Sequence, residues 1–207
     1  ILEFTDYVQP NVALNDKELD ANFFQHLPYL DNFISEHKEM KIANAGGIHI
    51  EPMGVYSRKI KKLDELKDGA SIAIPNDPTN GGRSLLLLEK AGLLKLREGS
   101  GTNPTVQDIT ENKKNLKFQE VEAAQVPRTL DDVDAAVINT NYAMQANLVP
   151  TKDALFMEDS TSPYVNIVAV RAGDEKRPEI QALMKALRSD EVKKFIDEKY
   201  KGAIVPA

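Results

Sequence analysis

Residues 71–91 read SIAIPNDPTNGGRSLLLLEKA and contain the signals of a strand, a turn and a helix in direct succession. The apolar run Ser71–Ile74 predicts a buried strand, and the leucine-rich segment Gly82–Ala91 predicts a helix. Between them, two prolines, two asparagines, an Asp and paired glycines are typical of a turn. A strand joined to a helix by a short turn is the repeating unit of an α/β fold.

Arg83 lies in the first turn of this predicted helix, where unpaired backbone N–H groups and the helix dipole favour a negative charge. We therefore expect a negatively charged group beside the guanidinium. A bound carboxylate could accept two hydrogen bonds from it. In the structural alternative, Arg83 pairs with a nearby acid such as Asp77. The sequence of this loop favours neither interpretation.

Composition limits the classes of protein that fit. With 207 residues and 42% hydrophobic content, the chain can form one large or two small domains. A net charge of -6 argues against nucleic acid as the main partner. No apolar run is long enough to span a membrane, and the lack of cysteine excludes disulfides and thiolate sites within the chain. Because the chain starts directly at Ile1, we expect an upstream piece to be missing.

Short apolar segments alternate with amphipathic segments along the chain, which favours an α/β architecture. The expected strands are Leu2–Thr5, Lys41–Ala45, Gly54–Ser57, Ser71–Ile74, Lys117–Glu120, Ala135–Ile138 and Val165–Val170. The expected helices are Pro28–His37, Leu63–Lys67, Gly82–Ala91, Thr140–Ala146, Pro178–Arg188 and Asp190–Tyr200.

Two polar breaks suggest where the chain passes between domains. The first is the charged segment Arg58–Lys67 with Gly69 after it, and the second is Asp159–Pro163. They divide the chain into a discontinuous outer lobe, residues 1–69 and 162–207, and an inserted middle lobe, residues 70–161. Two crossings between α/β lobes would place a ligand cleft at the hinge.

The signatures of several enzyme classes are absent. The chain has no GxSxG, no Walker loop and no complete GxGxxG, and its histidines, His26, His37 and His49, are too scattered for a zinc helix. His49-Ile50-Glu51 resembles half of a zinc-deaminase signature, but the cysteines of the other half are missing. We therefore expect no catalytic residue, no metal site and no cofactor.

Aromatic residues are concentrated near the start of the chain, where six of the thirteen fall within the first 33 positions. In the segment NFFQHLPY, residues 22–29, Pro28 suits the first turn of a helix and leaves Phe24, Gln25 and His26 on a connecting loop. Rings on a loop are suited to lining a pocket. In the alternative interpretation, at least two of these rings are part of the core.

Two asparagines adjoin predicted buried strands. Asn166 lies inside the run YVNIV, where its amide must find hydrogen-bond partners that a ligand could supply. Asn139 follows AAVI and could either bind a ligand or cap the helix that starts near Thr140. An arginine, two amides and a group of rings are the parts needed to hold a zwitterion with an apolar side chain. Binding without chemistry is the simpler inference.

Five segments of the chain carry a family resemblance. They are EFTDYVQPN at 3–11, DANFFQHLPYL at 20–30, PNDPTNGGRSLLLL at 75–88, AVINTNYA at 136–143 and SPYVN at 162–166. Together they resemble the methionine-binding lipoprotein family, the substrate-binding components of methionine ABC importers. The likeness runs through essentially the whole chain. It implies a two-lobed, two-crossover fold like that of periplasmic binding proteins, with the ligand enclosed between the lobes. It also implies a protein that is not an enzyme.

The resemblance further implies where the protein works and with what. Family members begin with a lipoprotein signal, an acylated cysteine, a strand and a helix, so we expect these parts to be missing before Ile1. The expected location is extracytoplasmic, with a lipid anchor in the membrane. The expected partners of this monomer are L-methionine, or a related amino acid or dipeptide, and the membrane subunits of an ABC transporter.

The matching motif positions imply a set of ligand-binding residues. The side chain of methionine would be surrounded by Tyr7, Phe24, His26 and Tyr29. Arg83 would bind the carboxylate, while Asn139 and Asn166 would bond the polar end of the amino acid. Two other classes remain open. One is an enzyme on the same fold that uses Thr79 or Thr140, and the other is a sensory ligand-binding module.

Overall fold

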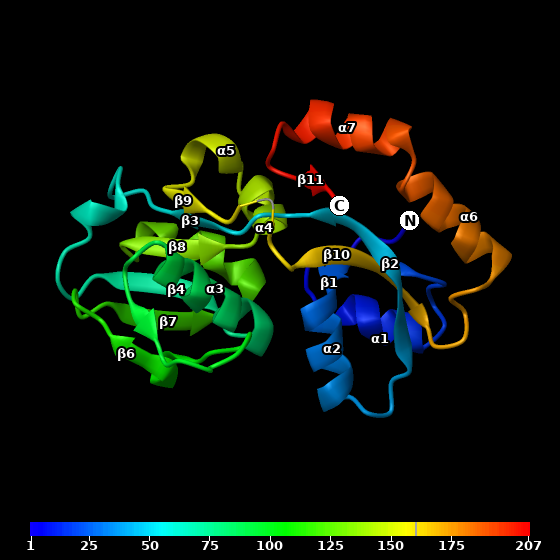
Figure 1. Ribbon diagram of the computed structural model, residues 1–207, viewed down its shortest axis with the longest axis horizontal. Coiled ribbons are helices and arrows are strands. Elements are labelled where there is room, and N and C mark those ends of the chain that lie inside the picture. Colours follow the sequence, from blue (N-terminus) through cyan, green and yellow to red (C-terminus); the bar gives the residue numbers. More distant parts are fainter. Residues whose placement is uncertain (160) are drawn as a thin grey trace. The chain divides into compact units, whose positions relative to one another are not determined.

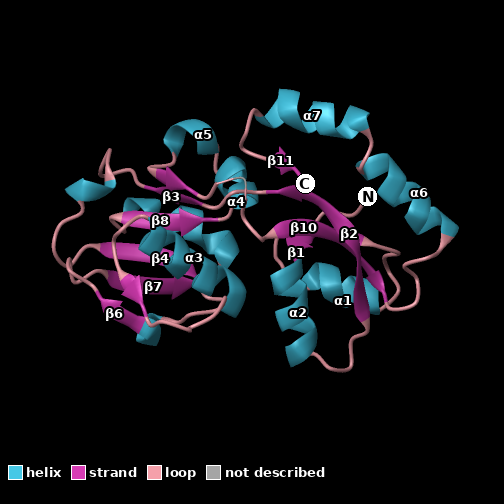
Figure 2. Cartoon of the chain, in the orientation of Figure 1, coloured by secondary structure: helices cyan, strands magenta, loops and turns pink. Residues whose placement is uncertain are grey.

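The computed structural model describes residues 1–159 and 161–207. These residues form two compact α/β units (Figure 1). The first unit contains residues 1–51 and 161–207, and the second unit contains Pro52–Asp159. Ser160, which belongs to the second predicted break, lies outside the described residues. Each unit has its own sheet, as the strands in Figure 2 show.

The second unit begins at Pro52, whereas the sequence analysis places the first boundary after residue 69. Residues 52–69 belong to this unit because strand β3 (Gly54–Tyr56) pairs along its length with β8 (Ala135–Ile138). Leu66 is also buried in the core of the unit. The segment Arg58–Lys67 is polar because it runs over the surface of the unit, and it does not mark its edge.

The first unit is built on a four-stranded sheet in which every neighbouring pair is antiparallel. Its strand order is β1 (Asn22–His26), β10 (Val165–Arg171), β2 (Ile42–Ile50) and β11 (Val205–Pro206). Its helices are α1 (Gln9–Asn15), α2 (Leu27–Glu36), α6 (Pro178–Leu187) and α7 (Asp190–Tyr200).

Strand β10 contributes to a core on each face of this sheet, because successive side chains of a strand point to opposite faces. Ile167 and Ala169 pack with residues of α1 and α2, whereas Val168 and Val170 pack with residues of α6. In Figure 1, α1 and α2 lie below the strands of this sheet, and α6 lies to the right of β2. Burial on both faces explains why the strand reads as a continuous apolar run.

The second unit is built on a mixed five-stranded sheet. Its strand order is β7 (Lys117–Val121), β4 (Ser71–Pro75), β8, β3 and β9 (Phe156–Met157). Strand β4 runs parallel to both β7 and β8, and β3 runs antiparallel to β8 and β9. A separate two-stranded ladder joins β5 (Lys95–Leu96) and β6 (Ile109–Glu111). The helical elements are α3 (Pro78–Lys90), α4 (Thr140–Gln145), α5 (Pro150–Asp153), η1 (Leu63–Glu65), η2 (Val106–Asp108) and η3 (Ala123–Asp131).

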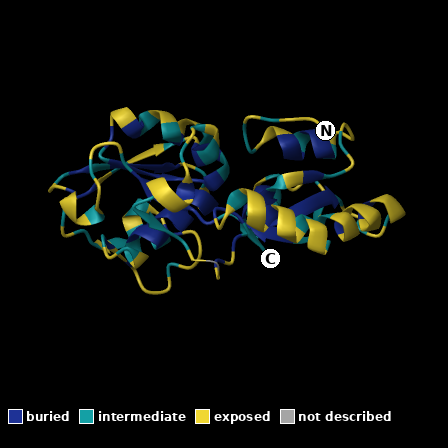
Figure 3. Ribbon diagram, turned by 90° about the horizontal axis from the view of Figure 1, so that it is seen from above, coloured by how far each residue is buried: buried dark blue, intermediate teal, exposed yellow. Residues whose placement is uncertain are grey.

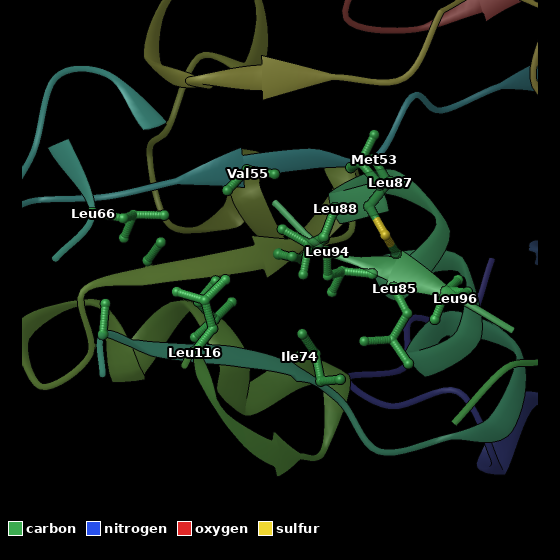
Figure 4. Packing of buried hydrophobic residues seen from close by; sticks show 14 residues of the cluster. Met53, Val55, Leu66, Ile74, Leu85, Leu87, Leu88, Leu94, Leu96 and Leu116 are labelled. Carbon is green, nitrogen blue, oxygen red and sulfur yellow. The ribbon is translucent and has the colours of Figure 1, made fainter. Parts of the chain in front are cut away.

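The core of the second unit explains the leucine run after Arg83. Leu85 and Leu88 of α3 are almost fully buried and pack in one cluster with Ile72, Ile74 and Val137 of the sheet (Figure 4). Burying a side chain of this kind stabilises the fold by about 1.5–3 kcal/mol. This packing fixes α3 on the sheet and thereby positions the polar residues at the start of the helix.

Most of the predicted elements are confirmed. The strands expected at Ser71–Ile74, Lys117–Glu120, Ala135–Ile138 and Val165–Val170 are β4, β7, β8 and β10, and those at Lys41–Ala45 and Gly54–Ser57 lie in β2 and β3. The helices expected at Pro28–His37, Thr140–Ala146, Pro178–Arg188 and Asp190–Tyr200 are α2, α4, α6 and α7. The helix expected at Leu63–Lys67 is the short 3-10 helix η1.

Three predictions are wrong. Leu2–Thr5 is not a strand, since Ile1 and Leu2 are mostly exposed and bury too little apolar surface to hold this segment in a sheet. Phe24–His26 belong to β1 and not to a loop, and helix α3 begins earlier than expected.

Figure 3 shows the buried strands and the exposed outer surfaces of the helices. Within the described residues, no helix has the length and apolar character needed to cross a membrane.

Candidate functional site

Helix α3 begins at Pro78 and not at Gly82 as predicted. Asp77 is the N-cap residue, and its Oδ1 accepts a hydrogen bond from the backbone N–H of Asn80 at 2.9 Å. Pro78 suits the first helical position, where its missing N–H costs nothing. The residues that resemble a turn are therefore the start of the helix, and Arg83 lies in its second turn.

The two glycines within α3 allow close packing of its backbone. A Cβ atom on Gly82 would lie 2.6 Å from the Cα of Asn103, and one on Gly81 would lie 2.9 Å from the carbonyl oxygen of Pro75. Both positions therefore exclude a larger side chain, and they hold the start of the helix tightly against neighbouring backbone.

Arg83 forms a buried, two-pronged ion pair with Glu158. Its Nε donates to Oε1 at 2.8 Å and its Nη2 donates to Oε2 at 2.5 Å. The exposed fraction of the side chain is 3% for Arg83 and 11% for Glu158. Glu158 Oε2 also accepts from the backbone N–H of Met53 at 3.0 Å. The expected negative partner of Arg83 is thus present within the chain, and it is Glu158 and not Asp77.

Asn139 and Arg83 are linked through Asn80, which lies on α3 one turn before the arginine. The Nδ2 of Asn139 donates to Oδ1 of Asn80 at 3.0 Å. Asn139 stands at the N-cap position of α4, but its side chain makes no capping hydrogen bond. Its Oδ1 is buried and has no hydrogen-bond partner in the part of the chain that the structure describes. A buried acceptor without a donor is costly, so this atom is suited to receive one from a ligand.

The two threonines considered for catalysis have structural roles. Thr79 Oγ1 donates to Oδ1 of Asp77 at 3.0 Å, within the cap of α3. Thr140 Oγ1 donates to the carbonyl oxygen of Pro52 at 2.5 Å. Neither contact resembles a nucleophile held by a general base.

In the first unit, three of the predicted residues form a cluster of rings. The ring centroids of Tyr7 lie 5.8 Å from those of both Phe24 and Tyr29, and Phe24 and Tyr29 lie 6.2 Å apart. Tyr29 and Phe33 are buried, so two of the six early rings do belong to the core. Tyr7 and Phe24 are only partly buried, which leaves ring surface available for contact.

A buried amide network holds the strand that carries Phe24. Asn11 and Gln25 exchange two hydrogen bonds, at 3.0 and 2.8 Å, and Asn22 joins them by donating to Asn11 Oδ1 at 2.9 Å. The network joins α1 to β1. Because fully satisfied polar networks rigidify their surroundings, it fixes the positions of the side chains between Asn22 and His26.

His26 and Asn166 are cross-strand neighbours, since they pair directly between β1 and β10. The Nδ1 of His26 accepts from the backbone N–H of Tyr29 at 3.1 Å, which caps α2. The neutral ring therefore carries its proton on Nε2. The ring of Tyr164 lies 5.0 Å from the imidazole of His26. On the other side of Asn166, in strand β2, stands His49.

The predicted site residues thus fall into two groups. Tyr7, Phe24, His26, Tyr29 and Asn166 lie in the first unit, and Arg83 and Asn139 lie in the second. The sequence did not point to Glu158, Asn80 or His49 as members of these groups. A single acid after a short strand or a polar residue inside a helix start carries no signal of its own. Only the fold shows which side chains they meet.

Comparison with known proteins identifies the class. The NlpA lipoprotein family model matches residues 1–207, and the chain belongs to this family. The fold agrees, because a solved nutrient-binding protein from Burkholderia cenocepacia bound to methionine is 55% identical. That match covers 100% of this chain and 86% of the other, with a TM-score of 0.95.

Curated relatives carry a more specific description. A probable D-methionine-binding lipoprotein MetQ of Vibrio cholerae is 51% identical over 99% of this chain and 76% of its own length. The D-methionine-binding lipoprotein MetQ of Escherichia coli strain K12 is 48% identical over the same shares of the two chains. The resemblance inferred from the sequence motifs is thereby confirmed.

Proposed function

We propose that this chain is the substrate-binding component of a methionine ABC importer, which captures methionine outside the cytoplasm and delivers it to the membrane subunits. The observation that carries the proposal is the buried group around Arg83. There, on adjoining elements, lie an ion pair and an amide whose oxygen has no hydrogen-bond partner within residues 1–159 and 161–207. Family membership and the methionine bound by a relative support it.

The polar end of methionine is a zwitterion, and the charges of the second unit suit one. Arg83 and Glu158 together are neutral, so a ligand of zero net charge leaves the charge balance unchanged. A guanidinium is a planar, permanently charged group with five N–H donors, a geometry that matches a carboxylate, and Arg83 already contacts the carboxylate of Glu158 through Nε and Nη2. The Oδ1 of Asn139, which has no hydrogen-bond partner among the described residues, would accept from the α-ammonium group.

The apolar end would meet the rings of the first unit. Tyr7, Phe24 and Tyr29, with His26 beside them, offer faces and edges to a thioether. Sulfur–aromatic contacts contribute about 0.3–1.5 kcal/mol each. Hydrogen bonds to charged groups contribute about 1.5–3 kcal/mol each. The polar end therefore dominates the affinity, and the rings select the side chain.

Each unit carries a part of the set of residues that we propose to bind methionine. The first unit supplies the rings and Asn166, and the second supplies Arg83 and Asn139. A ligand stabilises the conformation that binds it more tightly, by the difference in its affinity for the two conformations. We infer that this ligand-bound conformation is what the importer recognises. The protein would act as a monomer that is held at the membrane by a lipid anchor and carries out no reaction.

The test is to identify and titrate the ligand. Small molecules released by denaturing the purified protein are identified by mass spectrometry, and the refolded, ligand-free protein is then titrated calorimetrically with each enantiomer of methionine. We expect methionine to be released unchanged and to rebind with one-to-one stoichiometry. Release of a methionine-containing dipeptide would replace the proposed ligand. Conversion of added methionine to a product would favour an enzyme, and a protein that binds neither compound would refute the proposal.

A further inference from the structure

Three polar residues form a row across neighbouring strands of the first unit. Asn166 on β10 pairs directly with His26 on β1 and with His49 on β2. Directly opposed residues of antiparallel strands have their side chains on the same face, within about 5.5 Å at Cβ. All three residues are buried. Of the three, His49 has no part in the proposed function.

The contact of His49 with Glu51 shows which ring nitrogen of His49 carries a proton. Its Nε2 lies 2.9 Å from Oε1 of Glu51, whose side chain is 18% exposed. A carboxylate can only accept a hydrogen bond, so Nε2 must carry the proton that is shared with it. The ring of Phe23 packs edge-on against the imidazole, with centroids 5.0 Å apart, and helps to hold its plane.

The same nitrogen also faces Asn166, and this contact decides how the amide is oriented. Nε2 lies 3.3 Å from the Nδ2 atom of Asn166. Two donors cannot bond to each other, so Nε2–H and Nδ2–H₂ conflict in this orientation. Turning the amide by half a rotation places Oδ1 opposite Nε2–H and resolves the conflict, because the proton then lies between two acceptors. The same turn points the Nδ2 amino group away from His49.

We propose that His49, held by Glu51, is a positioning residue that orients the Asn166 amide so that its Nδ2–H₂ group donates to the carboxylate of the bound amino acid. The inference rests on the proposed function, in which Asn166 contacts the polar end of the ligand. The inference gives the two asparagine amides different hydrogen-bonding roles. Asn166 acts as a donor to the carboxylate, and Asn139 acts as an acceptor from the ammonium group.

The first test compares two substitutions of His49 in calorimetric titrations with methionine. His49→Phe removes the donor, so the Asn166 amide loses its fixed orientation and affinity falls about tenfold. In His49→Gln, an amide N–H₂ replaces Nε2–H, and we expect affinity within about threefold of the unsubstituted protein. Equal losses in both variants, matched by equal losses of unfolding free energy without ligand, would show a merely structural role and overturn the inference.

A double-mutant cycle shows whether His49 acts through Asn166. With Asn166 already changed to alanine, His49→Phe should weaken binding no further, because the amide that it orients is gone. Additive losses would overturn the inference. If Asn166→Ala alone binds methionine normally, the proposed function loses Asn166 from its site and this inference falls with it. If Asn166→Ala is impaired but His49→Phe is not, only the inference fails.

The direction of the amide has its own test. Asn166→Asp keeps an acceptor for His49 but presents an oxygen where the proposal needs a donor, opposite the ligand carboxylate. We expect Asn166→Asp to bind methionine more weakly than Asn166→Ala does, with the fold of each variant checked by circular dichroism. Binding by Asn166→Asp as tight as that of the unsubstituted protein would mean that the amide accepts from the ammonium group, which would overturn the proposed orientation. Nitrogen NMR of the His49 ring should show the proton on Nε2, and a ring protonated on Nδ1 alone would contradict the proposal.

Discussion

Replacing Glu158 with glutamine tests the structure of the buried ion pair. The side chain keeps its size but loses its charge and one of its two acceptors. In the native protein this carboxylate accepts from Arg83 Nε at 2.8 Å, from Arg83 Nη2 at 2.5 Å and from Met53 N–H at 3.0 Å. The substitution puts an N–H₂ group against one set of these donors and removes the charge of Glu158 from beside the arginine, whose side chain is only 3% exposed.

The size of the effect follows from those contacts. A hydrogen bond to a charged group is worth about 1.5–3 kcal/mol, and breaking a buried ion pair costs about 3–5 kcal/mol when one partner is removed outright. Because glutamine still offers one oxygen, we expect Glu158→Gln to lower the free energy of unfolding by about 2–4 kcal/mol. The assay is urea unfolding of the ligand-free protein at neutral pH.

A matched control is available on the surface of the same unit. Lys95 and Glu111 form an ion pair at 2.9 Å, with side chains 64% and 42% exposed. Exposed pairs are worth about 0–1 kcal/mol, so Glu111→Gln should have little effect on stability. If Glu158→Gln costs no more than Glu111→Gln, the reasoning about the buried pair is refuted.

Three further predictions concern the ligand and the scaffold. Phe24→Ala should weaken the binding of methionine more than that of alanine, since the methyl side chain of alanine is too short to reach the ring. Equal losses for the two ligands in competition titrations would mean that the ring has only a structural role. A hydrogen bond from Ser71 N–H is the main cause of the lowered pKa of Asp134. Its carboxylate therefore stabilises the fold at neutral pH, and this stabilisation is lost as the pH falls through the lowered pKa. The unfolding free energy of Asp134→Ala should accordingly lie about 1 kcal/mol below that of the native protein at neutral pH. This difference should shrink as the pH falls through the lowered pKa of Asp134, whereas a difference independent of pH would contradict the reasoning. Gly82→Ala places a Cβ 2.6 Å from the Cα of Asn103 and should cost about 1–3 kcal/mol in urea unfolding, while unchanged stability would show that the backbone there can shift freely.

The elements that the sequence predicts well are those with one strong local signal. The four apolar residues of β8 and the Ser-Asp-Glu start of α7 are placed at the same residues by sequence and structure. Ser189 caps α7 by accepting from the backbone N–H of Val192 at 3.3 Å, and serine is a preferred residue at this position.

The mistakes arise where one pattern fits two structures. Asp77-Pro78 suits a turn and also suits the N-cap and first position of a helix, and the helix forms because Leu85 and Leu88 bury its far end. Phe24 and His26 belong to the segment NFFQHL, residues 22–27, in which polar and apolar residues do not alternate cleanly. They form a strand because they pair with β10, which lies more than a hundred residues away in the sequence.

For the site residues, the sequence predicts what kind of group each side chain needs as a partner, but not which residue supplies it. The position of Arg83 predicts a negatively charged partner. No feature of the neighbouring sequence identifies this partner as Glu158, which lies 75 positions further along the chain. The burial expected for Asn166 predicts a hydrogen-bond partner for its amide. This partner is His49, which lies 117 positions away in the sequence and is brought close by the pairing of β10 with β2. Long-range pairing of this kind is set by the fold as a whole, which a single sequence does not display.

Calorimetric titration of Arg83→Ala with methionine, beside the unsubstituted protein and Arg83→Lys, most directly tests whether this buried guanidinium binds the ligand carboxylate. Removal of the guanidinium should weaken binding by about a hundredfold or more, because at least one charged hydrogen bond to the ligand is lost and Glu158 then faces the carboxylate unneutralised. Lysine should recover only part of that loss, since an ammonium group cannot bond two oxygens side by side. If Arg83→Ala remains folded by circular dichroism and binds methionine with near-native affinity, Arg83 has no place in the site.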